Sequence, residues 1–170
     1  MGRHPHLAGL AFESAQDVAL AREALERCGA AGLASRSILE LSSGERQRVV
    51  FARALAQQPR VLLLDEPASF LDIRHQVEVY DIVREMAETR ERGVLTVLHD
   101  LNLAAEYCDR IYLLREGRIE AGGTTAEVFT YANLTRVFDT EVYVDTHELT
   151  GRLLVLPLSG RVRDRLAREE

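Results

Sequence analysis

Lysine is absent from this chain of 170 residues, and each of its 21 basic residues is an arginine. Without lysine, the chain offers no amine for a Schiff base, no lysine nucleophile and no ammonium group to hold a nucleotide phosphate. The 27 acidic residues outnumber the arginines and leave a formal net charge of −6. Because an acidic surface repels a polyanion, nucleic acid is not an expected partner.

Proline, cysteine and long apolar runs are also scarce. Four prolines and 11 glycines in a chain that is 46% hydrophobic exclude the disordered and collagen-like classes. The two cysteines, Cys28 and Cys108, lie in apolar, helix-like surroundings, so we interpret them as core residues in a reducing compartment. There is no run of about 18 apolar residues and no secretory hydrophobic region, which predicts a chain that neither spans a membrane nor is exported.

Two helices are predicted in the first third of the chain from their capping residues. Ser14 and Asp17 have the spacing of a capping box, and the apolar helical pattern that follows ends at Gly29. Ser42 and Glu45 repeat this spacing before a second helix, which is expected to end before the next proline.

Strands and helices alternate over the middle of the chain. The apolar runs at 61–64 and 94–98 predict strands that are buried on both faces, as in a parallel sheet. Helices are expected at 74–92, where Gly93 is the stop, and at 101–107. This order of strand, helix, strand and helix predicts an α/β fold with a mostly parallel sheet.

Shorter elements are predicted in the last third of the chain. A strand and its hairpin partner are expected on either side of Glu116 and Gly117, and two late strands flank Thr150 and Gly151 as a small β appendage. The expected ranges are 111–114 and 118–121 for the first hairpin, 125–129 and 133–138 for two short helices, and 141–144 and 152–156 for the late strands. The alternating charges at 161–170 predict a solvated helical end.

Two carboxylates follow the first predicted strand, in the sequence VLLLDE at 61–66. The carboxyl edge of a parallel sheet is where α/β proteins gather their ligands. Asp65 could hold a hard cation such as Mg²⁺, and Glu66 could orient or deprotonate an attacking water. The alternative is structural, because the same carboxylates could cap the loop before Pro67.

The stretch LSSGERQRV at 41–49 places a serine- and glycine-containing turn at the start of a capped helix. Free backbone N–H groups and the helix dipole favour an anion there, so a phosphate could bind. The alternative is a plain helix cap, which Ser42 and Glu45 satisfy by themselves.

The histidines give weaker signals. His99 ends the second predicted strand and could contact a phosphate oxygen or a water, or it could simply be packed and hydrogen-bonded. His4 and His6 lack a carboxylate or thiol pattern that would complete a ligand set, so we assign them no metal. His75 and His147 are expected at the surface.

The order and spacing of these motifs carry more information than any one of them. LSSGERQRV is followed by VLLLDEP, by SFLD at 69–72 and by VLHD at 97–100. This set resembles the ATP-binding subunit of ABC transporters, with its L-S-G-G-Q signature, Walker B strand and glutamate, D-loop and switch histidine. GRHPH at 2–6, LDIRHQ at 71–76 and HDLNLAAEYCDRI at 99–111 look like the importer branch for iron-siderophore, haem or cobalamin.

The resemblance implies a role for each matching residue, with ATP and Mg²⁺ as cofactors. Asp65 would support Mg²⁺, Glu66 would polarise the attacking water and His99 would be the switch histidine near the γ-phosphate. Asp72 would belong to the D-loop at an interface between two subunits. In the head-to-tail dimer of this family, the signature residues would face the ATP held by the other subunit; here these are Leu41, Ser42, Ser43, Gly44 and Glu45.

Two signature positions depart from the family pattern. Ser43 stands where the family usually has glycine, and its Cβ would crowd a close approach of the backbone to phosphate. Glu45 replaces glutamine, and its negative charge would weaken phosphate binding unless the carboxylate turns away as a cap.

The family's phosphate-binding loop, G-x-x-x-x-G-K-[ST], has no counterpart in a chain without lysine. The resemblance therefore implies a C-terminal portion of an ABC ATPase domain, which is expected to be inactive alone and to leave sheet edges unpaired. The expected parts are 1–58 as the helical subdomain with the signature, 59–123 as the Walker B and switch-histidine core, 124–158 as C-terminal helices and strands, and 159–170 as a charged tail.

The function implied by the resemblance is ATP binding and hydrolysis coupled to import of an iron complex, haem or cobalamin. The implied partners are a second ATP-binding subunit and a membrane permease, which would hold the chain at the cytoplasmic face of the membrane. One alternative is a non-catalytic module that completes the composite ATP site of an intact subunit. A second alternative is an ABC ATPase outside transport, such as a DNA-repair protein, which the net charge of −6 disfavours.

Overall fold

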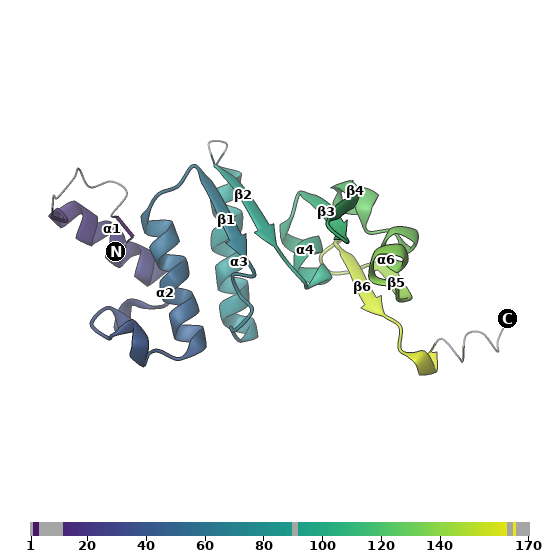
Figure 1. Ribbon diagram of the computed structural model, residues 1–170, viewed down its shortest axis with the longest axis horizontal. Coiled ribbons are helices and arrows are strands. Elements are labelled where there is room, and N and C mark those ends of the chain that lie inside the picture. Colours follow the sequence, from purple (N-terminus) through teal and green to yellow (C-terminus); the bar gives the residue numbers. More distant parts are fainter. Residues whose placement is uncertain (1, 4–11, 90–91, 163–164, 166–170) are drawn as a thin grey trace. The chain divides into compact units, whose positions relative to one another are not determined.

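The computed structural model describes residues 2–3, 12–89, 92–162 and 165. Contacts divide the chain into two compact units, Met1–Val97 and Leu98–Glu170, and each unit is described by itself. Figure 1 shows the elements of both units in the order of the sequence.

The two predicted capping boxes are both present in the first unit. Helix α1 (Ala15–Arg27) begins after Ser14, whose hydroxyl accepts from the backbone N–H of Asp17, and the Asp17 carboxylate accepts from the Ser14 N–H in return. Helix α2 (Ser43–Ala56) begins in the same way after Ser42, with Glu45 as the returning carboxylate. These reciprocal bonds satisfy N–H groups that have no partner inside a helix, which is why the spacing predicted both starts.

Two 3-10 turns, η2 (Ala31–Leu33) and η3 (Ile38–Glu40), fill the connection between the two helices, and the sequence pattern did not predict them. The first helix ends as expected, because Gly29 has a φ of +58°, a conformation that glycine adopts without a Cβ clash. Cys28 is buried beside this turn, and burial raises the pKa of its thiol to about 11, so it is an inert core residue as predicted. Cys108, in the second unit, is partly buried, and both cysteines are free.

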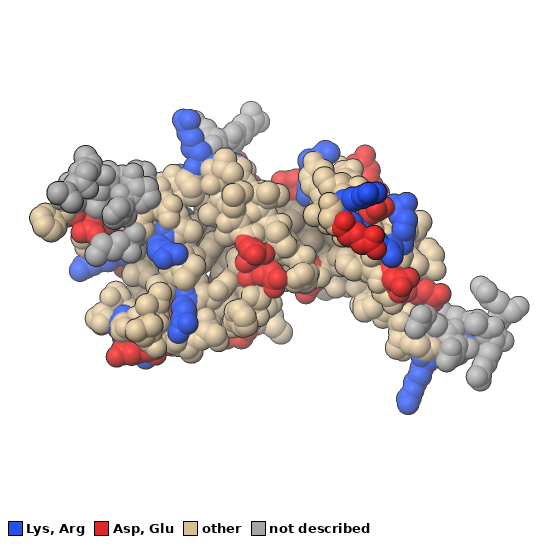
Figure 2. Space-filling view, in the orientation of Figure 1, with Lys and Arg blue, Asp and Glu red and all other residues tan. Residues whose placement is uncertain are grey.

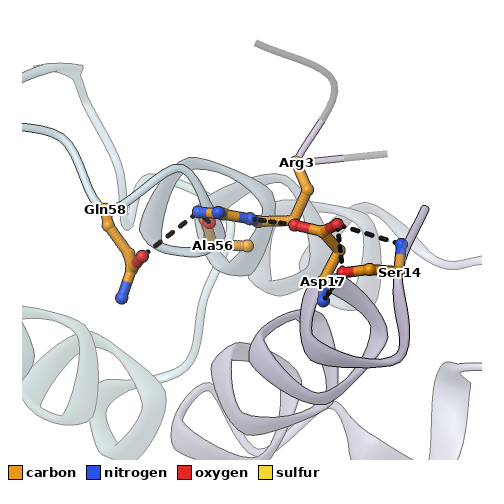
Figure 3. A network of polar contacts seen from close by, with 5 residues as sticks. All are labelled: Arg3, Ser14, Asp17, Ala56 and Gln58. Atoms are coloured by element: carbon orange, nitrogen blue, oxygen red, sulfur yellow. Dashed lines mark hydrogen bonds and ion pairs between the residues drawn. The ribbon is translucent and has the colours of Figure 1, made fainter. Parts of the chain in front are cut away.

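Arg3 contacts both helices of the first unit (Figure 3). The Arg3 Nε donates to an Asp17 oxygen at 2.9 Å, and its Nη1 donates to the Ala56 carbonyl at 3.1 Å and to Gln58 Oε1 at 3.2 Å. A Cβ on Gly2 would lie 2.7 Å from the Arg53 carbonyl oxygen, so only glycine fits at that position. One arginine thus joins the start of α1 to the end of α2, where helix carbonyls lack partners of their own.

Strand β1 (Val61–Asp65) pairs with β2 (Gly93–Val97) in parallel, and helix α3 (Ile73–Glu88) connects them. Leu62 is buried, whereas Leu63 and Leu95 are 69% and 61% exposed. The prediction that both strands are buried on both faces is therefore wrong. Successive side chains point to opposite faces of a sheet, and in the described residues α3 packs against β2 from one side. Figure 2 shows a surface with few charges over these two strands.

The predicted end of the helix after β1 is also wrong, because α3 stops at Glu88 rather than at residue 92. Thr89 is extended, and its hydroxyl donates to the Met86 carbonyl at 2.7 Å. That bond satisfies a carbonyl at the helix end and removes the need for a glycine stop. Gly93 instead begins β2, in register with Val61.

The second unit begins with the predicted helix α4 (Leu101–Tyr107) and continues with β3 (Arg110–Arg115) and β4 (Arg118–Thr124). These strands form the predicted antiparallel hairpin, and the two turn residues, Glu116 and Gly117, have φ values of +52° and +75°. Positive φ at both positions is the requirement of a type I′ turn, which matches the twist of the strands.

The remaining elements of the second unit enclose its core. They are α5 (Thr125–Val128), α6 (Tyr131–Phe138), β5 (Val142–Thr146) and β6 (Leu153–Pro157). The late strands pair in antiparallel fashion, as predicted. The Asn102 side chain ties α4 to β6, since it accepts from the Val155 N–H at 2.8 Å and donates to the Val155 carbonyl at 3.2 Å. The core of this unit centres on Val128, Phe129 and Leu134, which are almost fully buried.

The loop between the late strands holds His147, which was predicted at the surface. Its side chain is half-buried, and its Nδ1 is shielded from solvent with no hydrogen-bond partner among the described residues. His4 and His6 lie outside the residues that the structure describes, as do most of residues 161–170. None of the described helices is both long enough and apolar enough to cross a bilayer.

Candidate functional site

The candidate site of the first unit starts at the carboxyl end of β1. Asp65 is the last residue of this strand, pairs in register with Val97 and is exposed. Glu66 follows with a φ of +44°, a left-handed conformation that is uncommon for a side-chain-bearing residue and clusters at functional sites. The Glu66 N–H donates to the Val97 carbonyl at 3.2 Å, and its carbonyl accepts from the backbone N–H and the hydroxyl of Ser69. The surrounding backbone therefore holds Glu66 in this conformation.

The predicted signature residues 41–45 lie at the start of α2, where Leu41 and the cap residue Ser42 precede the helix and the other three form its first turn. Leu41 is buried, whereas Ser42 and Ser43 are exposed at the helix start. The Glu45 carboxylate accepts from the Ser42 N–H at 2.9 Å, and this bond lowers the pKa of Glu45 more than any other interaction. Arg36 lies 3.3 Å from the same carboxylate. The negative charge at this unusual signature position is thus engaged by the cap and by an arginine.

Gly44 brings α2 into close contact with the segment that follows β1. A Cβ at this position would lie 3.1 Å from the Phe70 carbonyl oxygen and 3.6 Å from Leu71 Cδ2. Gln47, one turn further along α2, donates from Nε2 to the carbonyls of Glu66 at 3.3 Å and Pro67 at 2.9 Å. The start of α2 therefore packs closely against the segment 65–72 and is hydrogen-bonded to it.

Asp72 ends this segment and caps α3. Its Oδ1 accepts from the His75 backbone N–H at 3.0 Å and lies 2.7 Å from His75 Nδ1. The backbone hydrogen bond from His75 is the largest cause that lowers the pKa of the Asp72 carboxyl. His75 was predicted as a surface position, but its ring is half-buried and held against Asp72. The Asp-x-x-His spacing, which joins a cap to the third helical residue, is a local signal that could have indicated this pair.

His99 belongs to the second unit, where it precedes α4. It is followed by Asp100, which caps α4 by accepting from the N–H groups of Asn102 and Leu103 at 2.8 and 3.0 Å. The structure therefore brings together the predicted site residues of the first unit, from Leu41 to Asp72, and places His99 at the start of the other unit. Gln47 and His75 are the two residues of this region that the sequence analysis did not assign to the site.

The carboxylate chemistry at the end of β1 fits Mg²⁺ better than a metal that needs a full protein cage. No group of three or more histidine, cysteine, aspartate or glutamate side chains that could hold a metal is found in the described ranges. Mg²⁺ usually keeps several waters and takes one or two carboxylates together with substrate phosphates. A single exposed carboxylate such as Asp65 suits that mode of binding.

Comparison with known proteins gives the family. Residues 4–69 match the family described as ABC transporter. The chain is 44% identical over 161 residues to the cobalamin import ATP-binding protein of Halobacterium salinarum, covering 95% of this chain and 40% of the relative. It is 49% identical over 157 residues to the hemin import ATP-binding protein of Streptomyces coelicolor, covering 92% and 55%. The chain thus spans about half the length of the curated relatives that it matches.

Solved structures agree with this assignment. An inward-facing metal-chelate type ABC transporter aligns with a TM-score of 0.82 at 28% identity, over 94% of this chain and 65% of the other. The dimeric structure of a bacterial ABC transporter cassette aligns with a TM-score of 0.64 at 29% identity, over 70% and 51%. These neighbours confirm the predicted fold class, an α/β arrangement of the P-loop ATPase type. The chain therefore belongs to the ABC transporter family of ATP-binding domains.

Proposed function

We propose that this chain forms the signature-bearing part of the ATP-binding subunit of an importer, and that the cargo is cobalamin, haem or a related iron complex. The observation that carries the proposal is the packing of the signature turn of α2 against the segment that holds Asp65, Glu66 and Asp72. The relatives named for cobalamin and hemin import support the class of cargo.

Each carboxylate at the end of β1 has a distinct proposed role. Bound Mg²⁺ would neutralise charge on the β- and γ-phosphates, and Asp65 would hold it directly or through water. Glu66 would orient the attacking water and accept its proton, a role that requires a fixed position beside the phosphate. His99 would contact a γ-phosphate oxygen once nucleotide is bound.

The start of α2 is proposed to serve the nucleotide of a second subunit in a head-to-tail dimer. Its backbone N–H groups and dipole favour an anion, and the hydroxyl of Ser42 can still donate while its oxygen accepts the cap bond. Because Glu45 is paired with the Ser42 N–H and Arg36, its charge opposes phosphate less than a free carboxylate would. A permease would complete the assembly at the cytoplasmic face of the membrane.

The chain has no lysine, so the lysine of a phosphate-binding loop has to come from residues outside it. We therefore expect the 170 residues alone to bind Mg-ATP weakly, since no lysine grips the β- and γ-phosphates. Isothermal calorimetry checks this expectation, and micromolar affinity of the purified chain for Mg-ATP would contradict it.

The test of function joins this chain to a segment that carries the family's phosphate-binding loop, G-x-x-x-x-G-K-[ST], because the lysine of that loop is missing from the 170 residues. ATP hydrolysis by the fused protein, and its loss when that lysine is changed, is the expected result. If the fused protein is folded and binds ATP but does not hydrolyse it, the chain acts as a non-catalytic module that completes the site of an intact partner. That second function is favoured by the combination of an intact signature cap with the absence of lysine.

A further inference from the structure

Gln47 connects the signature helix to the residue proposed to polarise water. Its amide nitrogen reaches two consecutive carbonyls of the segment after β1, those of Glu66 and Pro67. We propose that Gln47 is a positioning residue, which fixes the backbone of Glu66 relative to the first turns of α2. This inference rests on the proposed function only for the role of Glu66, because the contact itself is a property of the folded chain.

The backbone of Glu66 needs such a constraint. Its φ of +44° costs free energy that neighbouring contacts must offset, and the following Pro67 has no N–H with which to fix the turn. Three donors converge on the Glu66 carbonyl: the N–H and hydroxyl of Ser69, and Gln47 Nε2. Of these three donors, only the Gln47 amide comes from a helix; the other two belong to Ser69, three residues after Glu66 in the same turn.

A second contact on the same face of α2 makes the connection rigid. Gly44 lies three residues before Gln47, a spacing that places both on one side of a helix. The Phe70 carbonyl comes so close to Gly44 that a Cβ there would lie at 3.1 Å. Movement of the start of α2, where we place the phosphate of the second subunit, would therefore displace the backbone of Glu66. Gln47 thus links the proposed catalytic residue to the start of α2, the proposed binding place for the nucleotide of a second subunit.

Glutamine suits this role because its amide group supplies two N–H donors without a charge. An ionised glutamate at this position would place a carboxylate against two carbonyl oxygens. A protonated glutamate could again donate one hydrogen bond, and methionine would keep the length of the side chain without any donor. Comparing ionised glutamate, protonated glutamate and methionine at position 47 therefore distinguishes the effect of hydrogen bonding from the effect of side-chain packing.

The experiment uses amide hydrogen exchange in the purified 170-residue chain. Gln47→Met should accelerate exchange at the Glu66 and Ser69 amides by about threefold or more, because both hydrogen bonds from Gln47 to the turn are lost. Exchange in α1 should stay unchanged. The matched control is Gln16→Ala, at an exposed position on α1, which should leave the turn as in the unmodified chain. A smaller acceleration in Gln47→Met overturns the proposal.

Gln47→Glu provides the readout that a packing role would not change. The measured quantity is the protection of the Glu66 and Ser69 amides in Gln47→Glu divided by that in Gln47→Met at the same pH. This ratio should rise as the pH is lowered from about 7.5 to about 5, because only the protonated carboxyl donates a hydrogen bond. A flat ratio across this range overturns the role of the donor. Neither arm requires ATP hydrolysis, so failure of the positioning role is distinguishable from failure of the proposed function.

Discussion

Helices α1 and α2 both start with a capping box, but the surroundings of the two boxes differ. Each has a serine cap and an acidic residue three positions later. At α1 the acid, Asp17, pairs with Arg3, and the two side chains are only 13% and 12% exposed. At α2 the acid, Glu45, pairs with Arg36, and these side chains are 26% and 46% exposed. The cap serines, Ser14 and Ser42, are both exposed, but the acid–arginine pair of the first cap is nearly buried, whereas that of the second cap is more accessible.

This difference teaches that a capping box predicts where a helix starts but not what the start is for. At the start of α1, the carboxylate of the capping box is held by an arginine that also reaches the end of α2 (Figure 3). The N-terminus of α2 keeps Ser42 and Ser43 at the surface, and its next turn packs on the segment that carries Glu66. Changes at α1 should therefore affect stability alone, and changes around α2 should also affect function.

The largest expected effect is on the rate of ATP hydrolysis, which should depend on the residues around α2 and not on those of α1. In the fused ATPase, Glu66→Gln keeps the shape of the side chain but removes the base, so turnover should fall by roughly 10² or more while ATP binding survives. Asp65→Asn should weaken Mg²⁺ binding as well as the rate. Asp17→Asn, at the other capping box, is the matched control and should leave turnover unchanged. Equal turnover in Glu66→Gln and the unmodified fusion would remove Glu66 from the mechanism.

A steric change in α2 should have the next largest effect. Gly44→Ala places a Cβ 3.1 Å from the Phe70 carbonyl oxygen, in a segment that Gln47 and Gln76 hold by hydrogen bonds to its carbonyls. Because that segment cannot easily retreat, we expect a loss of about 1–2 kcal/mol in the free energy of unfolding. Chemical denaturation measures this loss. Gly32→Ala is the control, since no atom lies within 4 Å of its added Cβ, and an equal loss there would contradict the steric explanation.

Much of this arrangement was predictable because it is local. Both capping boxes, the turn at Glu116 and Gly117, and the α/β order follow from residues close together in the sequence. The exposed face of β1 and β2 was not predictable, because burial depends on which layers cover a sheet. The contact of Gln47 with Glu66 joins residues 19 positions apart, so no short pattern indicates it. The pair of Asp72 and His75 is local, and its spacing could have been recognised.

Removing the cap hydroxyls should show whether the two helix starts differ in function as well as in stability. Ser14→Ala and Ser42→Ala should each lower the free energy of unfolding by about 1 kcal/mol, the usual effect of losing a serine cap. In the fused ATPase, Ser42→Ala should also slow hydrolysis, whereas Ser14→Ala should not. Thermal or chemical unfolding and a steady-state ATPase assay measure the two effects. A rate unaffected by Ser42→Ala would mean that the α2 cap is only structural, like the α1 cap.

The smallest effect concerns the acid response of the two caps. Asp17 has its pKa lowered from 3.8 to about 2, first by the hydrogen bond from the Ser14 hydroxyl and next by that from Arg3. A lowered pKa in the folded state contributes stability that is fully present above about pH 4 and is lost as the pH falls through the folded value near 2. Glu45 also has a lowered pKa, but its causes begin with Ser42, and Arg36 acts only as a weaker coulombic contribution.

The two arginines should therefore differ in what their removal does to the carboxyl beside them. Arg3→Ala removes a direct hydrogen bond from a nearly buried pair, so it should raise the pKa of Asp17 measurably towards its ordinary value. Arg36→Ala acts on an exposed pair that solvent screens, and it should raise the pKa of Glu45 less. Carboxyl titration by NMR in the 170-residue chain measures both shifts. Equal shifts would show that the two acid–arginine pairs are electrostatically alike, and the contrast between α1 and α2 would then rest on packing alone.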